Sequence, residues 1–111
     1  MMGLRESAMT QETVYDFQWD PAKALSNARK HGVTFEQAAT VFLDALALTV
    51  YDEANSQNEE RWFTLGLDAG ERLLAVAHTY EMRAPRSVQI RIISARKATR
   101  RERLSYENEP R

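Results

Sequence analysis

Five basic side chains gather near the end of the chain, where a predicted strand runs into a predicted helix. They are Arg96, Lys97, Arg100, Arg101 and Arg103. Guanidinium groups suit phosphate because their planar fork binds two oxygens and stays charged. Cations held at a strand end and a helix start, instead of on a loose tail, would form a preorganised site for a polyanion. We expect that polyanion to be RNA.

Such a site could cleave RNA without a metal. In that reaction the 2′-hydroxyl attacks the neighbouring phosphate and leaves a cyclic phosphate and a free 5′-hydroxyl. The reaction needs a base for the 2′ proton, cations for the charge of the phosphorane, and an acid for the departing oxygen. Arginines can meet the second need, and losing one such electrostatic donor typically costs about 10²–10³ in rate. The pattern does not name the acid and the base.

His78 is the strongest candidate for proton transfer. It lies on a predicted strand, and only histidine titrates near neutral pH without perturbation. By alternation it shares a strand face with Leu74 and Val76, so a core or edge histidine with satisfied hydrogen bonds is an equally good interpretation. Tyr80 follows at the end of the same strand and is a candidate RNA contact.

Two further arginines lie on predicted strands. Arg61 is the only base in an acidic region, and pairing with Glu59 or Asp52 is the structural alternative to a role in catalysis. Arg91 alternates with two isoleucines, so its side chain should face away from theirs. The catalytic candidates are therefore His78, Arg61, Arg91, Arg96 and Lys97.

Lys30 and His31 end a predicted helix just before Gly32. A cation is favoured at a helix C-terminus, so a capping role for His31 competes with a role in a site. The candidates for RNA binding are Lys30, His31, Tyr80, Arg100 and Arg101. Two of the helix arginines, Arg101 and Arg103, can also be solvated or paired with Glu102 and Glu107.

The first half of the chain predicts one strand and two helices. Tyr15, Phe17 and Trp19 alternate with polar residues and predict a short strand. The pair Asp20-Pro21 predicts the start of a helix that runs to about residue 30 and closes at a left-handed glycine. A Thr-x-x-Gln box at residues 34–37 opens a second helix. Its apolar positions share one face, and they are Phe35, Ala38, Ala39 and Phe42.

The second half predicts four strands and a helix. The strands cover about 45–50, 60–67, 72–80 and 88–95, and a turn at 68–71 in which Gly70 takes positive φ joins the middle pair. A loop at 81–87 precedes the last strand, which ends in a small-residue turn at Ser94-Ala95. A Thr-x-x-Glu box at 99–102 opens the helix at about 98–108. We therefore expect an α+β fold with a mostly antiparallel sheet of four to five strands, two N-terminal helices and a C-terminal helix, with the helices on one face.

Size and composition predict one domain at 14–108, after a disordered extension at 1–13. The net charge of −1 hides an asymmetry, since residues 44–71 hold seven acids against one arginine whereas residues 83–111 hold nine bases against three acids. No membrane span or signal peptide is predicted. Two histidines and no cysteine predict no zinc site, and the absence of cysteine is compatible with a cytoplasmic protein. No glycine-rich phosphate loop is present, and we expect no cofactor.

Three blocks resemble the BrnT family of ribonuclease toxins. They are FQWDPAKALSNARKHGVTFEQAATVFLD at 17–44, EERWFTLG at 59–66 and RIISARKATRRERLSYE at 91–107. Lys30 belongs to the family's KHG motif, and Arg61 belongs to its ExR motif. Two features depart from the pattern, namely the loop at 81–87, which looks longer than usual, and the extension at 1–13.

The resemblance implies a RelE-like toxin fold and a ribonuclease activity that blocks translation without needing the ribosome. It also implies a partner, a BrnA-like antitoxin with a ribbon-helix-helix DNA-binding part, which would neutralise the toxin and repress the shared operon with it. DNA would be contacted only through that antitoxin. Two alternatives stay open: a non-catalytic module that binds nucleic acid or a protein partner with the same basic face, and a copy whose toxicity has decayed.

Overall fold

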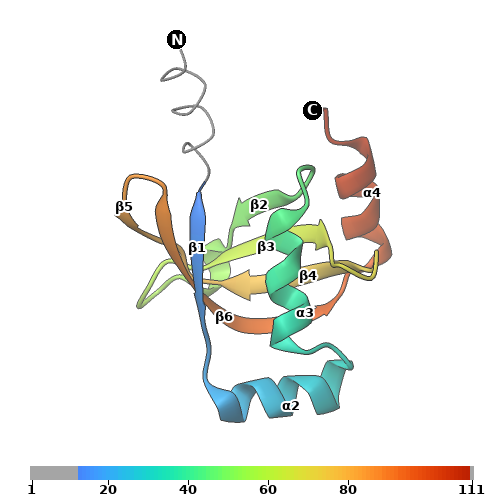
Figure 1. Cartoon of the computed structure of the whole chain (residues 1–111). Helices are drawn as coiled ribbons and strands as arrows, with labels where there is room; N and C mark the ends of the chain where they lie inside the picture. Colours follow the sequence, from blue (N-terminus) through green and yellow to red (C-terminus); the bar gives the residue numbers. More distant parts are fainter. Residues whose placement is uncertain (1–12, 111) are drawn as a thin grey trace, which may run out of the picture.

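A computed structural model describes residues 13–110, and it shows three α-helices and a six-stranded sheet (Figure 1). The predicted extension at 1–13 lies outside the described residues except for Thr13. The elements in chain order are β1 (Val14–Gln18), α2 (Pro21–His31), α3 (Phe35–Ala39), the 3₁₀ helix η1 (Thr40–Leu43), β2 (Leu48–Tyr51), the 3₁₀ helix η2 (Glu53–Asn55), β3 (Trp62–Leu67), β4 (Leu73–His78), β5 (Glu81–Ala84), β6 (Ser87–Lys97) and α4 (Arg100–Asn108). The α+β class is as expected, and the order of elements differs from the expected one by an additional strand, β5.

The sheet has the strand order β1-β6-β4-β3-β2, and β5 pairs with the first part of β6. All pairings are antiparallel except that of β1 with β6. The prediction of four to five strands was one too few, because residues 81–87 are not a loop. They form β5 and a tight turn in which Arg86 has a φ of 65°. β6 also continues through Ser94-Ala95 to Lys97, so the turn predicted there is wrong.

The predicted helix starts are confirmed by their caps. The Asp20 side chain accepts a hydrogen bond from Ala22 N at 2.8 Å, and Pro21 occupies the first turn. Gly32 closes α2 with a φ of 69°. Reciprocal capping boxes open α3 and α4 at the predicted residues, which stabilises two helices of only 5 and 9 residues.

The turn between β3 and β4 corrects one prediction. Glu71, with a φ of 64°, is its left-handed residue, and Gly70 is not. The cause is Asp68, whose Oδ1 accepts hydrogen bonds from Gly70 N at 2.9 Å and from Arg72 N at 2.8 Å. The carboxylate thereby fixes the backbone on both sides of residue 71.

Two hydrophobic clusters lie on opposite faces of the sheet. The first fills the space beneath α2 and α3 and comprises Val33, Phe35, Ala38, Val41, Leu74, Val76, Val88, Ile90, Ile92 and Ala95. The second lies under α4 and comprises Leu65, Leu73, Ala75 and Tyr106. Neighbouring residues of β4 belong to different clusters, as alternation requires. The expectation that all helices pack on one face is therefore wrong, because Tyr106, the only buried residue of α4, packs on the other face.

The buried side chain of Asn27 ties α2 to β6. Its Nδ2 donates to Val33 O at 2.9 Å and to Ala95 O at 2.8 Å, and its Oδ1 accepts from Ala95 N at 3.0 Å. The pairing of β1 with β6 ends at Arg91, so the Asn27 amide provides the hydrogen bonds that a neighbouring strand would otherwise give to Ala95. No helix within residues 13–110 is long and apolar enough to cross a membrane.

Candidate active site

A bulge in β6 decides which side chains reach the open face of the sheet. Ala77 pairs with Ser94 whereas His78 pairs with Ile92, so Ile93 has no partner in β4. Residues 91 and 96 are five positions apart and would face opposite sides of a regular strand. The extra residue at 93 restores them to one side, so Arg91 and Arg96 both face away from the first cluster. The predicted orientation of Arg91 relative to its isoleucine neighbours is confirmed.

Arg91 and Arg61 converge on one carboxylate oxygen at the end of this face. Nη2 of Arg91 contacts Oε1 of Glu59, and Nη2 of Arg61 lies 3.6 Å from the same atom. The three side chains are 35% to 44% exposed, so solvent and a ligand can reach them. Two of the predicted arginines thus meet around a residue that was not itself a candidate, and the contact of Arg61 with Glu59 is the pairing expected as the structural alternative. The signal for Glu59 was present in the sequence, since it stands two positions before Arg61 in the ExR motif.

The backbone around Arg61 is held by a closed loop. Asp52 N donates to Arg61 O at 2.8 Å, and Arg61 N donates to Ser56 Oγ at 3.0 Å. Asp52 is buried and accepts from Asn55 Nδ2 at 3.1 Å. Nε of Arg61 is buried and has no hydrogen-bond partner among residues 13–110, which is unusual for a guanidinium nitrogen.

Arg91 is held by Thr79 in the segment between β4 and β5. Thr79 N donates to Arg91 O at 3.0 Å, and Arg91 N donates to Thr79 Oγ1 at 3.2 Å. A hollow of about 390 Å³ opens beside Arg91. Its walls are Glu59, Glu60, Thr79, Tyr80, Glu81, Gln89 and Arg91. The predicted RNA contact Tyr80 therefore lies next to the arginine pair.

His78 lies in the core, with none of its surface exposed. Nδ1 lies 2.8 Å from the carbonyl oxygen of Thr79, and Nε2 lies 2.7 Å from Oγ1 of Thr64. A carbonyl only accepts, so Nδ1 carries the proton and Nε2 accepts from the Thr64 hydroxyl. Burial lowers the pKa of His78 below its usual value of 6.5. Both ring nitrogens are occupied, and neither reaches the open face.

Arg96 is engaged in the cap of α4. Its Nη1 and Nη2 donate to the two carboxylate oxygens of Glu102 at 2.8 and 3.0 Å. The hydrogen bond from Arg96 is the main cause that lowers the pKa of Glu102 to about 2, and the same contact raises the pKa of Arg96. Arg96 lies five positions beyond Arg91 on β6, roughly 15 Å along the strand. Lys97, Arg100 and Arg101 are exposed around this cap.

The remaining predicted residues lie elsewhere. Lys30 and His31 end α2, which packs on the opposite face of the sheet, so they are not brought to Glu59. Arg103 pairs with Glu107 at 3.9 Å, as the sequence suggested. Among residues 13–110, no three histidine, aspartate or glutamate side chains come together as a set of metal ligands.

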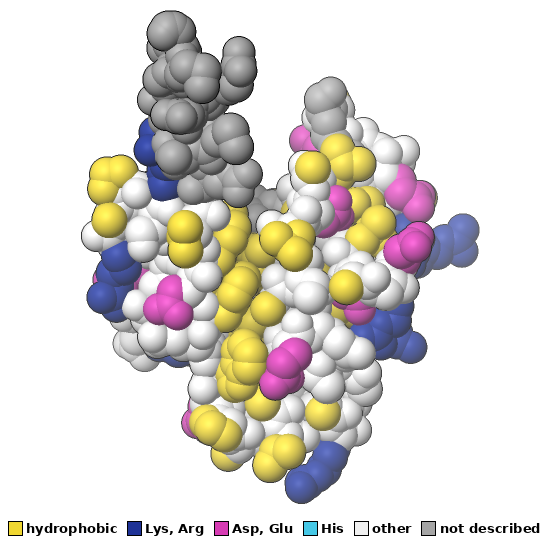
Figure 2. Space-filling view, viewed as in Figure 1, with side chains coloured by type: hydrophobic (Ala, Val, Ile, Leu, Met, Phe, Trp, Pro, Cys, Tyr) yellow, Lys and Arg dark blue, Asp and Glu magenta, His cyan; other side chains and the backbone are white. Residues whose placement is uncertain are grey.

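The face that carries α2 and α3 differs in character. Figure 2 shows a run of hydrophobic side chains down its middle, with lysine and arginine confined to the rim. The rings of Tyr15, Phe17 and Phe42 contribute to this apolar character, with centroids 5.4 to 5.9 Å apart. Because lysine and arginine supply much of the affinity for the RNA backbone, the face that carries Arg61, Arg91 and Arg96 is the better candidate for RNA.

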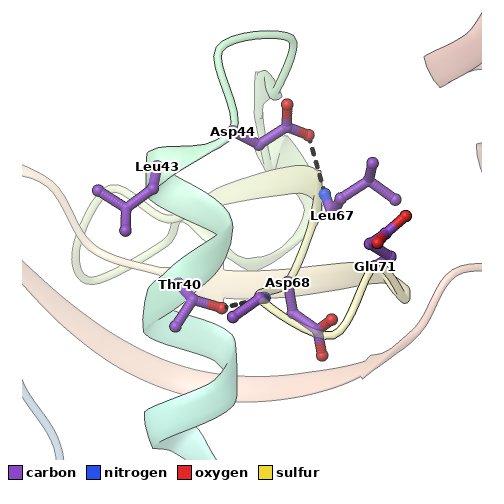
Figure 3. Close-up of a pocket in the computed structure, with 7 residues that line it drawn as sticks. Thr40, Leu43, Asp44, Leu67, Asp68 and Glu71 are labelled. Carbon is purple, nitrogen blue, oxygen red and sulfur yellow. Dashed lines mark hydrogen bonds between the residues drawn. The ribbon is translucent and has the colours of Figure 1, made fainter.

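A second hollow, of about 250 Å³, lies where η1 meets the β3–β4 turn (Figure 3). Its polar groups hold the fold together. Asp44 Oδ2 accepts from Leu67 N at 2.9 Å and from the Tyr106 hydroxyl at 2.5 Å, and Thr40 Oγ1 accepts from Ala69 N at 2.8 Å. These bonds connect η1, β3 and α4, which accounts for the polar residues without a ligand.

Comparisons with known proteins agree on one family. The model of the family described as the ribonuclease toxin BrnT of type II toxin–antitoxin systems matches residues 19–102. Among solved structures, the chain is similar to the Brucella abortus ribonuclease toxin BrnT, with 21% sequence identity and a TM-score of 0.53. The match covers 78% of this chain and 100% of that one, and at this identity it establishes a shared fold. No curated protein sequence matches the chain.

Proposed function

Because the chain belongs to the BrnT family of ribonuclease toxins of type II toxin–antitoxin systems, we propose that it is an endoribonuclease that cleaves RNA without a metal, by attack of the 2′-hydroxyl on the adjacent phosphate. The observation that carries the proposal is the convergence of Arg61 and Arg91 on Glu59 at an open face of the sheet. A carboxylate and two guanidinium groups in contact supply two of the three needs of the reaction.

In this proposal Glu59 takes the proton of the 2′-hydroxyl. Arg61 and Arg91 bind the scissile phosphate and stabilise the charge that develops on the phosphorane. Each guanidinium group contacts Glu59 through one nitrogen, which leaves further N–H groups for phosphate oxygens.

The other predicted residues would act outside the reaction. Arg96, Lys97, Arg100 and Arg101 would bind the RNA backbone further along the face, and Lys30 and His31 would contact only more distant parts of it. We assign His78 a structural role, because both of its ring nitrogens are engaged inside the core.

The biological role follows from the family. A type II system includes a protein antitoxin. We propose that this partner is BrnA-like, with a ribbon-helix-helix part, and that it covers the arginine-bearing face. RNA cleavage in the cytoplasm would then stop translation until the antitoxin returned. The α+β arrangement also supports a RelE-like fold.

Incubation of the purified chain with RNA in EDTA tests the proposal. We expect cleavage that leaves 2′,3′-cyclic phosphate and 5′-hydroxyl ends. Glu59→Gln should lower the rate by about 10²–10⁴, the usual contribution of a general base. The matched control is Glu53→Gln, which neutralises an exposed glutamate of η2 and should cleave like the parent.

Two results would contradict the proposal. RNA that stays intact but binds with strong dependence on salt would indicate a binding module without turnover. Equal activity of Glu59→Gln and the parent would show that the base lies elsewhere. Arg91→Lys adds a further measurement. A lysine keeps the positive charge but cannot bind two phosphate oxygens at once, so this variant should cleave RNA more slowly than the parent.

A further inference from the structure

The hollow beside Arg91 is rich in hydrogen-bond acceptors. Glu60 contributes an exposed carboxylate. Gln89 donates one N–H of its amide to Gln18 Oε1 at 2.9 Å, and its carbonyl oxygen can accept from a ligand. Glu81 uses Oε1 to accept from Arg83 at 2.8 Å and retains a second oxygen. A ligand with hydrogen-bond donors on one edge can therefore bind these acceptors.

One wall of the hollow is aromatic. Tyr80 is 46% exposed, so a ligand in the hollow can reach its ring. Aromatic side chains at nucleic-acid sites stack on the unpaired bases of single strands. The exposed carboxylate of Glu60 would repel phosphate, so the hollow suits a neutral base and not the RNA backbone.

Resting on the proposed function, we propose that this hollow is a nucleobase subsite that selects guanine. The base would belong to the nucleotide whose 2′-hydroxyl attacks, since Glu59 and Arg91 border both the hollow and the reacting phosphate. Tyr80 stacks on the base, and Glu60 accepts from its edge.

Guanine is the base whose edge matches these acceptors. Its N1–H and its N2 amino group are adjacent donors, and one carboxylate can accept from both. Adenine presents a ring acceptor beside its amino group, and cytosine does the same. Uracil presents a single donor between two carbonyl oxygens. Each of these three would set an acceptor against a carboxylate, which a site of this kind penalises.

The test uses DNA oligonucleotides that contain a single ribonucleotide, so that only one 2′-hydroxyl can react. Four substrates differ in that ribonucleotide, and a fifth carries inosine, which lacks the N2 amino group. We expect the guanosine substrate to be cleaved about tenfold or more faster than the other three standard substrates, because tenfold corresponds to about one hydrogen bond. Inosine should fall between guanosine and adenosine.

Three variants locate the effect. Glu60→Gln should bring guanosine and adenosine to within about threefold, with Glu53→Gln as the control that keeps the preference. Tyr80→Leu should raise KM for all substrates by about tenfold, as expected for loss of one stacked base, and Tyr80→Phe should restore it.

The outcomes separate the two proposals. If the parent chain cleaves none of the substrates and also leaves natural RNA intact, the proposed function fails. If it cleaves all four standard substrates at equal rates, or if Glu60→Gln keeps the full preference for guanosine, the guanine subsite is overturned while the ribonuclease stands.

Discussion

Replacement of His78 by leucine separates a structural histidine from a catalytic one. Leucine fills an apolar site but offers no partner to the Thr79 carbonyl or the Thr64 hydroxyl, which now lie 2.8 and 2.7 Å from the ring nitrogens. Leaving a buried polar group unsatisfied costs about 1–3 kcal/mol, and Thr64 keeps Thr49 as a partner at 2.8 Å. We therefore expect His78→Leu to lower the free energy of unfolding by about 2–4 kcal/mol.

Urea denaturation measures this loss as a lower midpoint with an unchanged slope. The pH dependence provides a second measurement. Because burial lowers the pKa of His78 in the folded chain, the unfolded chain binds the proton first, and the parent should lose stability as the pH falls below 6.5. The leucine variant should lack this component.

Activity decides between the roles. Measured without denaturant, where the variant is folded, cleavage by His78→Leu should stay within about tenfold of the parent, because a general base or acid would contribute 10²–10⁴. The control combines His78→Leu with Thr64→Val, which removes both partners of the hydrogen bond between these side chains. The double variant should lose less stability than the sum of the two single variants, because removing both partners costs less than leaving one unsatisfied. A hundredfold loss of activity with an unchanged urea midpoint would refute the structural assignment.

Three further predictions concern stability. Asn27→Ala should cost about 2–4 kcal/mol in urea denaturation, because it strips partners from buried backbone groups, whereas its exposed neighbour Ser26→Ala should change little. Glu102 has a pKa of about 2 in the folded chain against a usual 4.5, so its stabilising effect should be complete above pH 4.5 and disappear as the pH falls towards 2. Glu102→Gln should remove this pH dependence of the free energy of unfolding, which is worth about 1–2 kcal/mol after allowance for solvent screening. Thermal melts at pH 3 and pH 6 measure it, and a variant whose two melting temperatures differ as much as those of the parent would contradict the prediction. Tyr106→Phe removes the hydrogen bond to Asp44 and should cost about 1.5–3 kcal/mol by the same denaturation, and an unchanged midpoint would show that this contact contributes nothing.

Elements that depend on local chemistry were predictable from the sequence. The boxes that begin at Thr34 and Thr99 join residues three positions apart, so the pattern alone identifies both helix starts. The same holds for the cap at Asp20 and the left-handed Gly32. The prediction that Gly70 is the left-handed residue of the turn before β4 was wrong. Glycine is the usual left-handed residue, but here the hydrogen bonds of the Asp68 side chain set the conformation and place Glu71 in that region.

The site was less predictable, because its geometry depends on pairing between distant strands. The sequence singled out Arg61 and Arg91, but 30 positions separate them in the chain, and no periodicity indicates that both contact Glu59. It also placed Arg96 among the free phosphate ligands, whereas the capping glutamate three residues beyond Thr99 engages its guanidinium group. A glutamate that caps a helix can occupy a nearby arginine, and this competition is not visible in a count of charges.

Ile93, which has no partner in β4, determines which face of the sheet each later side chain of β6 occupies. Deletion of Ile93 would move the side chains of residues 94–97 to the opposite face of the sheet. Ala95, now buried beneath α2, would then face solvent, and Arg96, which binds Glu102 of α4, would point into the apolar interior. Substitution of Ile93 keeps the chain length, so a scan by substitution would not reveal this effect. The number of residues between Arg91 and Arg96 therefore matters independently of their identity.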